Sequence, residues 1–203
     1  MKNGARASAL LFCLAFGFGC SGLEVGRDVQ SGRMALQTRR PEAALTYLTR
    51  AAELDPNYKL PNRARVGVLT YLGRAYYEVG NDTKARATLQ QALRNDGNDA
   101  LAHVYFGLTL YRAKERDQGR KEIETGLNGI HAWLDEVSAD GIYGAYWDPA
   151  KSIRTAVERT LAGKPEAGEF TASAERIARQ FDNEFDRASQ AESESIYQRG
   201  GKD

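Results

Sequence analysis

Residues 69–92 read LTYLGRAYYEVGNDTKARATLQQA, and they carry the clearest indication of the fold. In its first half, Leu69, Leu72 and Tyr76 recur at spacings of three and four residues, which places them on one face of a helix. The second half repeats this spacing with a second set of apolar residues. They are Ala85, Leu89 and Ala92. The stretch therefore predicts two amphipathic helices in succession.

The residues between these two stripes predict a tight turn. Gly80 is suited to end the first helix, because glycine tolerates the left-handed backbone that follows a helix terminus. Asn81 and Asp82 follow at once and offer side-chain oxygens to cap the next helix. Gly73 and Ala85 are small, and we expect them to lie where the two helices approach closely.

Small residues recur at the same places along the chain. Gly32, Gly73 and Gly107 are each followed by a small residue 12 positions later and by another seven positions after that. The first two copies are offset by 41 residues and the next two by 34, and the difference matches an insertion at 59–65. The small residues that follow are Ala44, Ala85 and Gly119, then Ala51, Ala92 and Gly126. A fixed period of this kind is the signature of a repeat architecture.

The middle copy resembles the tetratricopeptide repeat, whose pattern is W-x2-L-G-x2-Y…A-x3-F with a period of 34 residues. Leu69 stands for the Trp and Leu89 for the Phe. The resemblance extends from Val25 to Trp133, and it implies an all-α fold: a short helical solenoid of three helix-turn-helix units followed by C-terminal capping helices. The repeats span residues 20–135, with units at 25–58, 66–99 and 100–133.

The flanking units are less regular than the middle one. The first has Asp28 and Ser31 where bulky apolar residues are expected, which suits a terminal unit whose outer face meets water. The third places His103 at the bulky position, where we expect it to be a core residue.

Residues 136–203 form a C-terminal extension with a different character. A Gly- and aromatic-rich segment at 140–147 leads to Asp148-Pro149, which suggests a capped helix that runs to about Ala162. After a short linker, apolar residues at spacings of three and four predict a last helix, whose polar end, 191–203, is expected to fray. The rings of residues 143–147 have two interpretations: they cover the open end of the solenoid, or they hold a small ligand such as a glycan.

The N-terminus resembles the signal peptide of bacterial lipoproteins. Lys2 and Arg6 precede an uncharged, largely apolar stretch, and residues 17–20 read GFGC. This resembles a lipobox, which implies that residues 1–19 are removed and that Cys20 becomes the lipidated N-terminus. Gly17 departs from the Leu that the family usually has. An ordinary cleaved signal and an uncleaved anchor remain alternatives.

The residue after Cys20 implies a location. Ser21, rather than Asp, resembles the pattern that directs lipoproteins to the outer membrane of Gram-negative bacteria, and the anchor would be several acyl chains such as palmitate. The other cysteine, Cys13, would leave with the leader. The exported chain would then have no thiol for disulfide or metal chemistry.

Composition argues against several functional classes. The chain has 28 Lys and Arg against 27 Asp and Glu, and loss of Lys2 and Arg6 with the leader shifts the net charge to about −1. A nucleic-acid-binding protein would be strongly basic. Two histidines, and the lack of phosphate-loop, dinucleotide or nucleophile-elbow motifs, indicate that the protein is not an enzyme and needs no cofactor or metal.

The resemblance also implies a protein-binding groove, because the first helices of successive repeats line the concave face. Arg33 and Arg74 share one position in adjacent units, so they form a short cationic stripe or are simply solvated arginines. The residues expected in this groove are Arg33, Gln37, Thr70, Arg74, Tyr77, Val104, Leu108 and Tyr111.

Together these features predict a membrane-tethered adaptor that binds another envelope protein, in secretion, pilus, envelope or cell-wall assembly. The alternative is a small-ligand or glycan-binding module that uses residues 143–147, and a hydrolase is a distant third.

Overall fold

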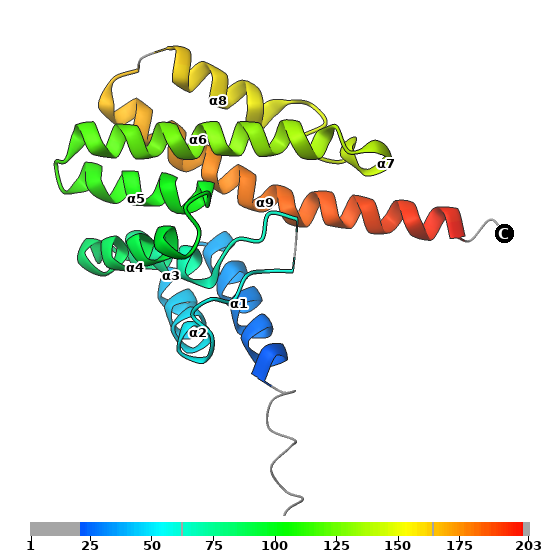
Figure 1. Cartoon of the computed structure of the whole chain (residues 1–203), viewed down its shortest axis with the longest axis horizontal. Coiled ribbons are helices and arrows are strands. Elements are labelled where there is room, and N and C mark those ends of the chain that lie inside the picture. Colours follow the sequence, from blue (N-terminus) through cyan, green and yellow to red (C-terminus); the bar gives the residue numbers. More distant parts are fainter. Residues whose placement is uncertain (1–20, 62, 164, 201–203) are drawn as a thin grey trace, which may run out of the picture.

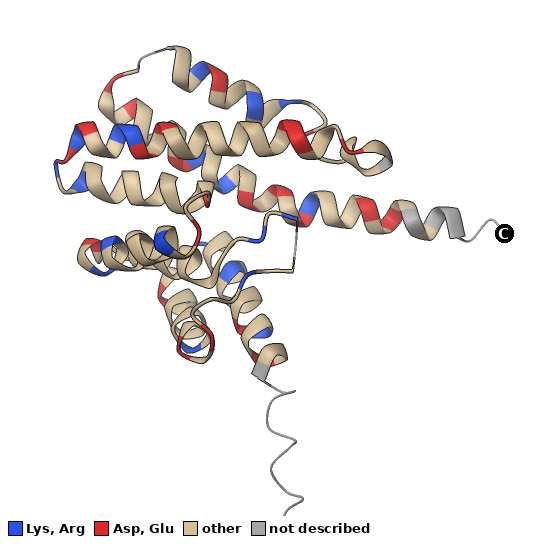
Figure 2. Ribbon diagram, in the orientation of Figure 1, with Lys and Arg blue, Asp and Glu red and all other residues tan. Residues whose placement is uncertain are grey.

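The computed structural model describes residues 21–61, 63–163 and 165–200, and over these residues the protein is built from α-helices (Figure 1). The predicted all-α solenoid is confirmed. The expected leader and the lipidation site Cys20 lie outside the described residues. Within the described part, no helix is long and apolar enough to cross a membrane. Acidic and basic residues are interspersed over the helices (Figure 2).

Six helices form the three predicted pairs. Consecutive helices of a pair are antiparallel, and each pair packs on the next: the α2–α3 and α4–α5 contacts join the units. The bounds are α1 Ser21–Gln37, α2 Pro41–Leu54, α3 Val68–Glu78, α4 Asp82–Asn95, α5 Ala100–Arg112 and α6 Arg116–Ser138.

The turn between α3 and α4 follows the sequence. Gly80 has a φ of +79°, and the backbone N–H of Asn81 donates to the carbonyl of Tyr76 at 2.9 Å. The side-chain oxygen of Asn81 then accepts from the N–H of Lys84 at 3.2 Å, which caps α4.

The repeated spacing of glycines reflects close packing within each pair. A Cβ on Gly73 would lie 2.5 Å from Cγ of Leu89, and one on Gly32 would lie 2.4 Å from Cγ of Leu48. The contact of Gly73 is therefore with Leu89, rather than with Ala85 as expected from the spacing. In the third unit the backbones of α5 and α6 themselves are in contact: a Cβ on Gly107 would lie 2.6 Å from the backbone oxygen of Gly119.

Two expectations about irregular positions are wrong. Asp28 does not face water: it is 1% exposed and accepts a 2.5 Å hydrogen bond from Nε of Arg50, so the apolar position holds an ion pair between α1 and α2. His103 is half-buried rather than in the core, and its Nδ1 lies 2.7 Å from Glu122 of α6.

Three further helices complete the fold: α7 Gly141–Gly144, α8 Ser152–Ala162 and α9 Ala167–Gly200. The helix expected at Asp148-Pro149 begins later, at Ser152. Asp148 still caps it, because its carboxylate accepts from the N–H groups of Ile153 and Arg154, both at 3.1 Å. The polar end of α9 is helical to Gly200. Helix α9 runs back from α8 past α6 and α5 (Figure 1), and its side chains reach α1 and α3 of the first two repeats.

Candidate functional site

The inner surface of the repeats is occupied by α9. At its centre lies Asp182, which is fully buried. Arg33 of α1 donates to Oδ1 of this carboxylate at 3.1 Å, and Arg74 of α3 donates to Oδ2 at 3.0 Å. The hydroxyl of Tyr71 donates to Oδ1 at 2.9 Å. Two repeats thus bind one carboxylate from the C-terminal helix.

Neighbouring carboxylates balance the two arginines. Arg33 also contacts Asp186, and Arg74 donates to Glu78 at 2.8 Å. Burial alone would lower the pKa of Arg74, but Tyr105 and the carboxylates of Asp182 and Glu78 outweigh it and raise the pKa. Both arginines therefore stay charged, and the cationic stripe suggested by the sequence is real but neutralised from within the chain.

Other predicted groove residues flank this cluster on the same side. Gln37 donates to Asp186 at 2.7 Å, and the Tyr77 hydroxyl donates to Glu175 at 3.3 Å. Burial, followed by the charge of Glu175, raises the pKa of Tyr77 to about 12. The ring of Tyr111 lies 6.1 Å from that of Phe170. Each of these partners belongs to α9.

Three predicted groove residues make no hydrogen bond or ring contact with α9 among the described residues. Thr70 is turned toward the α4–α5 turn, where its hydroxyl donates to Asp99 at 2.6 Å. Val104 packs inside its own repeat, against Gly126 of α6. Leu108 is buried in the core. Thr70 therefore points away from α9, while the place of Val104 and Leu108 in the groove stays a prediction.

The structure corrects the expectation of an open groove. The apolar side of α9 buries Phe170, Ile177, Phe181 and Phe185, none more than 3% exposed. At about 1.5–3 kcal/mol for each large side chain, their burial contributes roughly 6–12 kcal/mol. That range is close to the whole stability of a typical domain, about 5–15 kcal/mol. Helix α9 is thus an integral part of the fold, and partner binding by the groove residues stays a prediction that requires its removal.

Sequence reasoning identified the apolar stripe of α9 but missed Asp182. The signal was present: an acidic residue stands directly after Phe181, on the face that holds Ile177, Ala178 and Phe185. A carboxylate on an apolar helix face must find buried cations, and Arg33 and Arg74 were the candidates.

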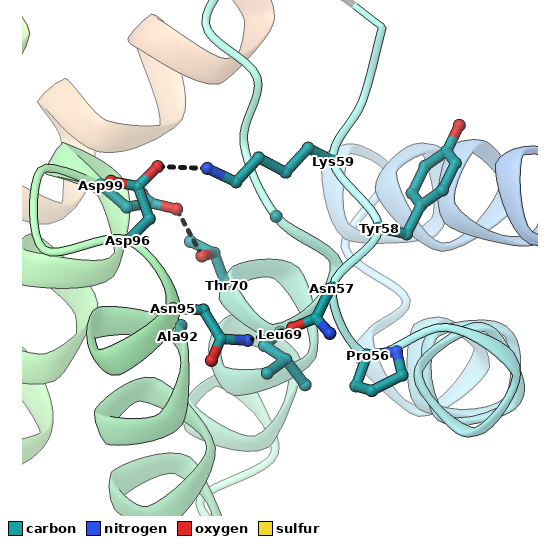
Figure 3. A pocket seen from close by; sticks show the side chains of 11 residues that line it. Pro56, Asn57, Tyr58, Lys59, Leu69, Thr70, Ala92, Asn95, Asp96 and Asp99 are labelled. Carbon is teal, nitrogen blue, oxygen red and sulfur yellow. Dashed lines mark hydrogen bonds and ion pairs between the residues drawn. The ribbon is translucent and has the colours of Figure 1, made fainter.

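A depression of about 400 Å³ lies where residues 56–59, at the start of the 59–65 insertion, meet α3 and the α4–α5 turn (Figure 3). Lys59 donates to Asp96 at 2.6 Å, and Asp99 accepts from Thr70 and from the N–H of Ala102. Burial raises the pKa of Asp99. Because these polar groups already pair with one another, the cluster joins the insertion to the repeats.

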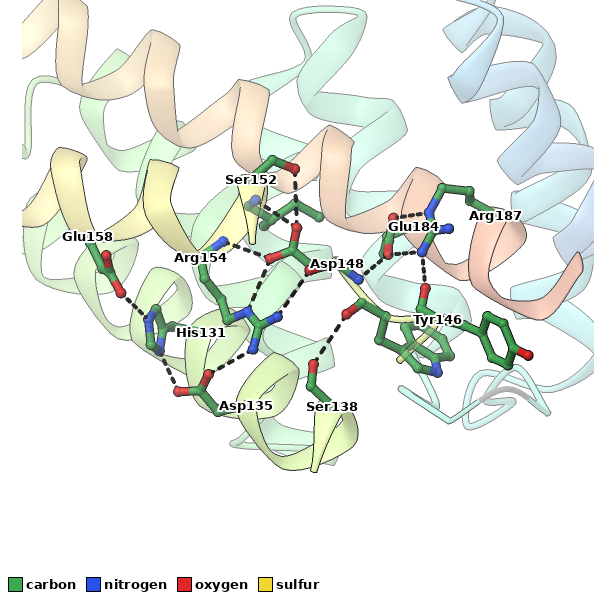
Figure 4. A network of polar contacts seen from close by, with 12 residues as sticks. His131, Asp135, Ser138, Tyr146, Asp148, Ser152, Arg154, Glu158, Glu184 and Arg187 are labelled. Carbon is green, nitrogen blue, oxygen red and sulfur yellow. Dashed lines mark hydrogen bonds and ion pairs between the residues drawn. The ribbon is translucent and has the colours of Figure 1, made fainter. Parts of the chain in front are cut away.

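A polar network fixes α8 and the preceding segment to the body of the protein (Figure 4). Arg154 donates to Asp148 and to Asp135 of α6, both at 3.2 Å. Glu184 of α9 accepts from the N–H of Asp148 at 2.5 Å. His131 lies between Asp135 and Glu158, at 3.0 and 3.1 Å. In the described ranges, no three or more His, Cys, Asp or Glu side chains are grouped so as to hold a metal ion.

One ring of the aromatic segment, that of Trp147, packs against α6 and α9. Trp147 is buried, with its ring centroid 5.0 Å from that of Trp133 in an edge-on arrangement, and its Nε1 donates to Glu192 at 2.9 Å. Its neighbours Phe185 and Phe181 extend the same cluster. For Trp147 this agrees with a structural role rather than ligand binding, because the buried ring is not accessible to a ligand.

The opposite end of the repeats is not covered by another described helix. Between α1 and α2 lies an outer depression of about 370 Å³, which includes Met34 (55% exposed) and Tyr47 (37% exposed). The charged residues that line it are Arg27 and Arg40. This surface, defined by Met34, Tyr47, Arg27 and Arg40, is called the outer face of the first repeat below.

Comparison with known families agrees with the geometry. Residues 35–105, from the last turn of α1 into α5, match the family model for the tetratricopeptide repeat. No curated protein matched the chain. Tetratricopeptide repeats generally mediate protein–protein interaction and scaffolding. The chain is therefore an all-α, tetratricopeptide-like helical solenoid whose residues 35–105 are similar to tetratricopeptide repeats.

Proposed function

We propose that this protein is a lipid-anchored scaffold that holds another envelope protein close to the periplasmic face of the outer membrane. The tetratricopeptide-repeat region supports the scaffolding role. The lipobox-like GFGC at 17–20, followed by Ser21, supports the anchor and its location.

The observation that carries the proposal is the outer face of the first repeat. With α9 in the inner groove, this is where apolar surface stays exposed on the repeats. Among the described residues, four of the five large exposed hydrophobic side chains belong to α1 and α2; they are Leu23, Met34, Tyr47 and Leu54. Exposed apolar residues that gather in one region mark interaction sites more often than scattered ones do.

The charges around this face indicate the chemistry of the partner. Arg27 and Arg40 flank the apolar residues, and neither has an ion-pair partner among the described residues. A partner segment with an apolar stripe bordered by Asp or Glu therefore complements the face.

Cross-linking in intact cells, followed by purification of the solubilised anchored protein, tests the proposal. One stoichiometric protein partner should be recovered from the wild type. The double variant Met34→Asp, Tyr47→Ala should lose it by more than tenfold, since hot-spot contacts are worth about 2 kcal/mol or more each. Tyr197→Ala is the control, because Tyr197 is 85% exposed but lies on α9.

Two results would contradict the proposal. A protein that leaves the membrane fraction when its leader is intact would refute the anchor. Equal recovery of the partner with the double variant and with Tyr197→Ala would refute the outer face as its binding site.

A further inference from the structure

The distance between the lipid site and the folded domain is set by covalent geometry. Helix α1 begins at Ser21, the residue after Cys20. Leu23 is three residues from Cys20, so it lies at most about 11 Å from it along the chain, whatever the intervening conformation. If Cys20 carries the lipid, there is no linker of useful length between bilayer and solenoid.

The end of the first repeat nearest to Cys20 presents apolar side chains. Leu23 is 81% exposed and Leu54 is 48% exposed. Both lie at the same level of the α1–α2 hairpin: the pair Asp28–Arg50 fixes its register, and Leu23 and Leu54 are respectively five residues before Asp28 and four residues after Arg50. At about 1.5 Å per residue, they lie about 7.5 and 6 Å beyond this pair, toward the same end.

We infer that this end of the α1–α2 hairpin rests on the bilayer surface, with Leu23 and Leu54 in the interfacial region. The inference depends on the proposed lipid anchor and specifies how the anchored domain is placed. A lipid surface is the occupant favoured by the position of Cys20, because the anchor delivers this end of the helix pair to the bilayer.

The surrounding charges limit the depth of this contact. Glu24, Glu53 and Asp55 lie beside the two leucines in the sequence, and carboxylates are costly to bury in hydrocarbon. The leucines therefore enter the interface while the domain stays outside it. The repeats then stand away from the membrane, with α8 on the side of the molecule opposite the start of α1 (Figure 1).

This placement also positions the outer face of the first repeat. Met34 follows Leu23 by 11 residues in one helix, which corresponds to about 16 Å along the axis. A partner bound at Met34 would thus be held within about 16 Å of the membrane contact at Leu23, measured along α1.

Single cysteines report the contact, since the sequence has cysteine only at positions 13 and 20. The variants are Leu54→Cys, Met34→Cys and Arg159→Cys, the last on an exposed position of α8. Each is made in the full precursor, and the purified lipidated protein is placed in vesicles of phosphatidylethanolamine and phosphatidylglycerol. The reaction rate with a membrane-impermeant maleimide is compared, without vesicles, with that of the same variant made without residues 1–19 and with Cys20→Ser, so that the introduced cysteine is the only thiol in both proteins.

We expect Leu54→Cys to react at least tenfold more slowly in vesicles, while Met34→Cys and Arg159→Cys react at unchanged rates. Ten Gly and Ser residues inserted after Ser21 should restore the rate at position 54 while the protein stays with the vesicles. Protection at position 54 should not depend on the ratio of protein to lipid.

Each other result overturns the inference. If the anchored protein reacts at full rate at position 54, its folded domain does not rest on the bilayer. The proposed scaffold function is then unaffected, but the membrane contact is refuted. Protection at both 54 and 34 means that α1 lies flat, and protection that grows with surface density means that a second copy covers this end. A mature protein that does not stay with vesicles refutes the anchor and the placement together.

Discussion

Arg33 and Arg74 occupy the same position in successive repeats, 41 residues apart, and donate to opposite oxygens of one buried carboxylate, that of Asp182. The sequence offset makes the two guanidinium groups neighbours on the inner surface, and α9 brings the carboxylate between them. The repeats therefore bind a helix in the same chain with the residues that were expected to bind a separate protein.

Removal of this carboxylate should be severely destabilising. In Asp182→Ala, two arginines remain in the interior without their shared partner, and breaking a buried ion pair typically costs about 3–5 kcal/mol. Urea unfolding followed by circular dichroism measures the loss. Asp186→Asn is the control, because Asp186 is 48% exposed and contributes about 1 kcal/mol or less. Similar losses for the two variants would show that the cluster around Asp182 does not stabilise α9.

The packing between the helices of a repeat should resist enlargement at Ala85. This side chain is fully buried in α4, and a Leu there should cost about 1–3 kcal/mol through overpacking. Ala87→Leu, two residues on and exposed, should stay within about 0.5 kcal/mol of the wild type. Thermal unfolding of both variants tests the register of the repeats, and a larger loss from Ala87→Leu would contradict it.

Trp147 should be important for stability rather than for binding. Truncation of a buried Trp to Ala costs about 3–5 kcal/mol, and Trp147→Ala removes edge-on contacts with Trp133 and the hydrogen bond to Glu192. Denaturant unfolding gives the value, with the half-buried Tyr143→Ala as a milder comparison. A glycan that stabilises the wild type but not a fully stable Trp147→Ala variant would revive the ligand-binding alternative.

Stability should depend on acid through Asp28. The hydrogen bond from Arg50 lowers the pKa of this buried carboxyl below its usual value of 3.8. A depressed folded-state pKa contributes stability that is fully present above the unfolded-state pKa and is lost as pH falls through the folded value. The difference in unfolding free energy between wild type and Asp28→Asn should thus be constant from about pH 6 to 8 and shrink below about pH 4. A difference that grows on acidification would exclude this linkage.

The local sequence determined the helices and the repeat register, because those features rest on short-range patterns. Apolar residues at spacings of three and four fixed α3 and α4, while Gly80 and Asn81 fixed the turn between them through backbone conformation and capping. Gly73 indicates that another helix packs closely against α3, and the repeat period identified that helix as α4. These interactions join residues at most a few turns or one hairpin apart.

What fills the inner surface depends on contacts between distant parts of the chain. The contact between Arg33 and Asp182 spans 149 residues, and no local period relates α9 to α1. The sequence is equally compatible with packing of the apolar stripe of α9 on the end of the solenoid or on a second molecule. Shape and charge together place α9 on the inner surface. The buried carboxylate of Asp182 needs nearby cations and hydrogen-bond donors, and the folded repeats supply two guanidinium groups and a hydroxyl on their concave side.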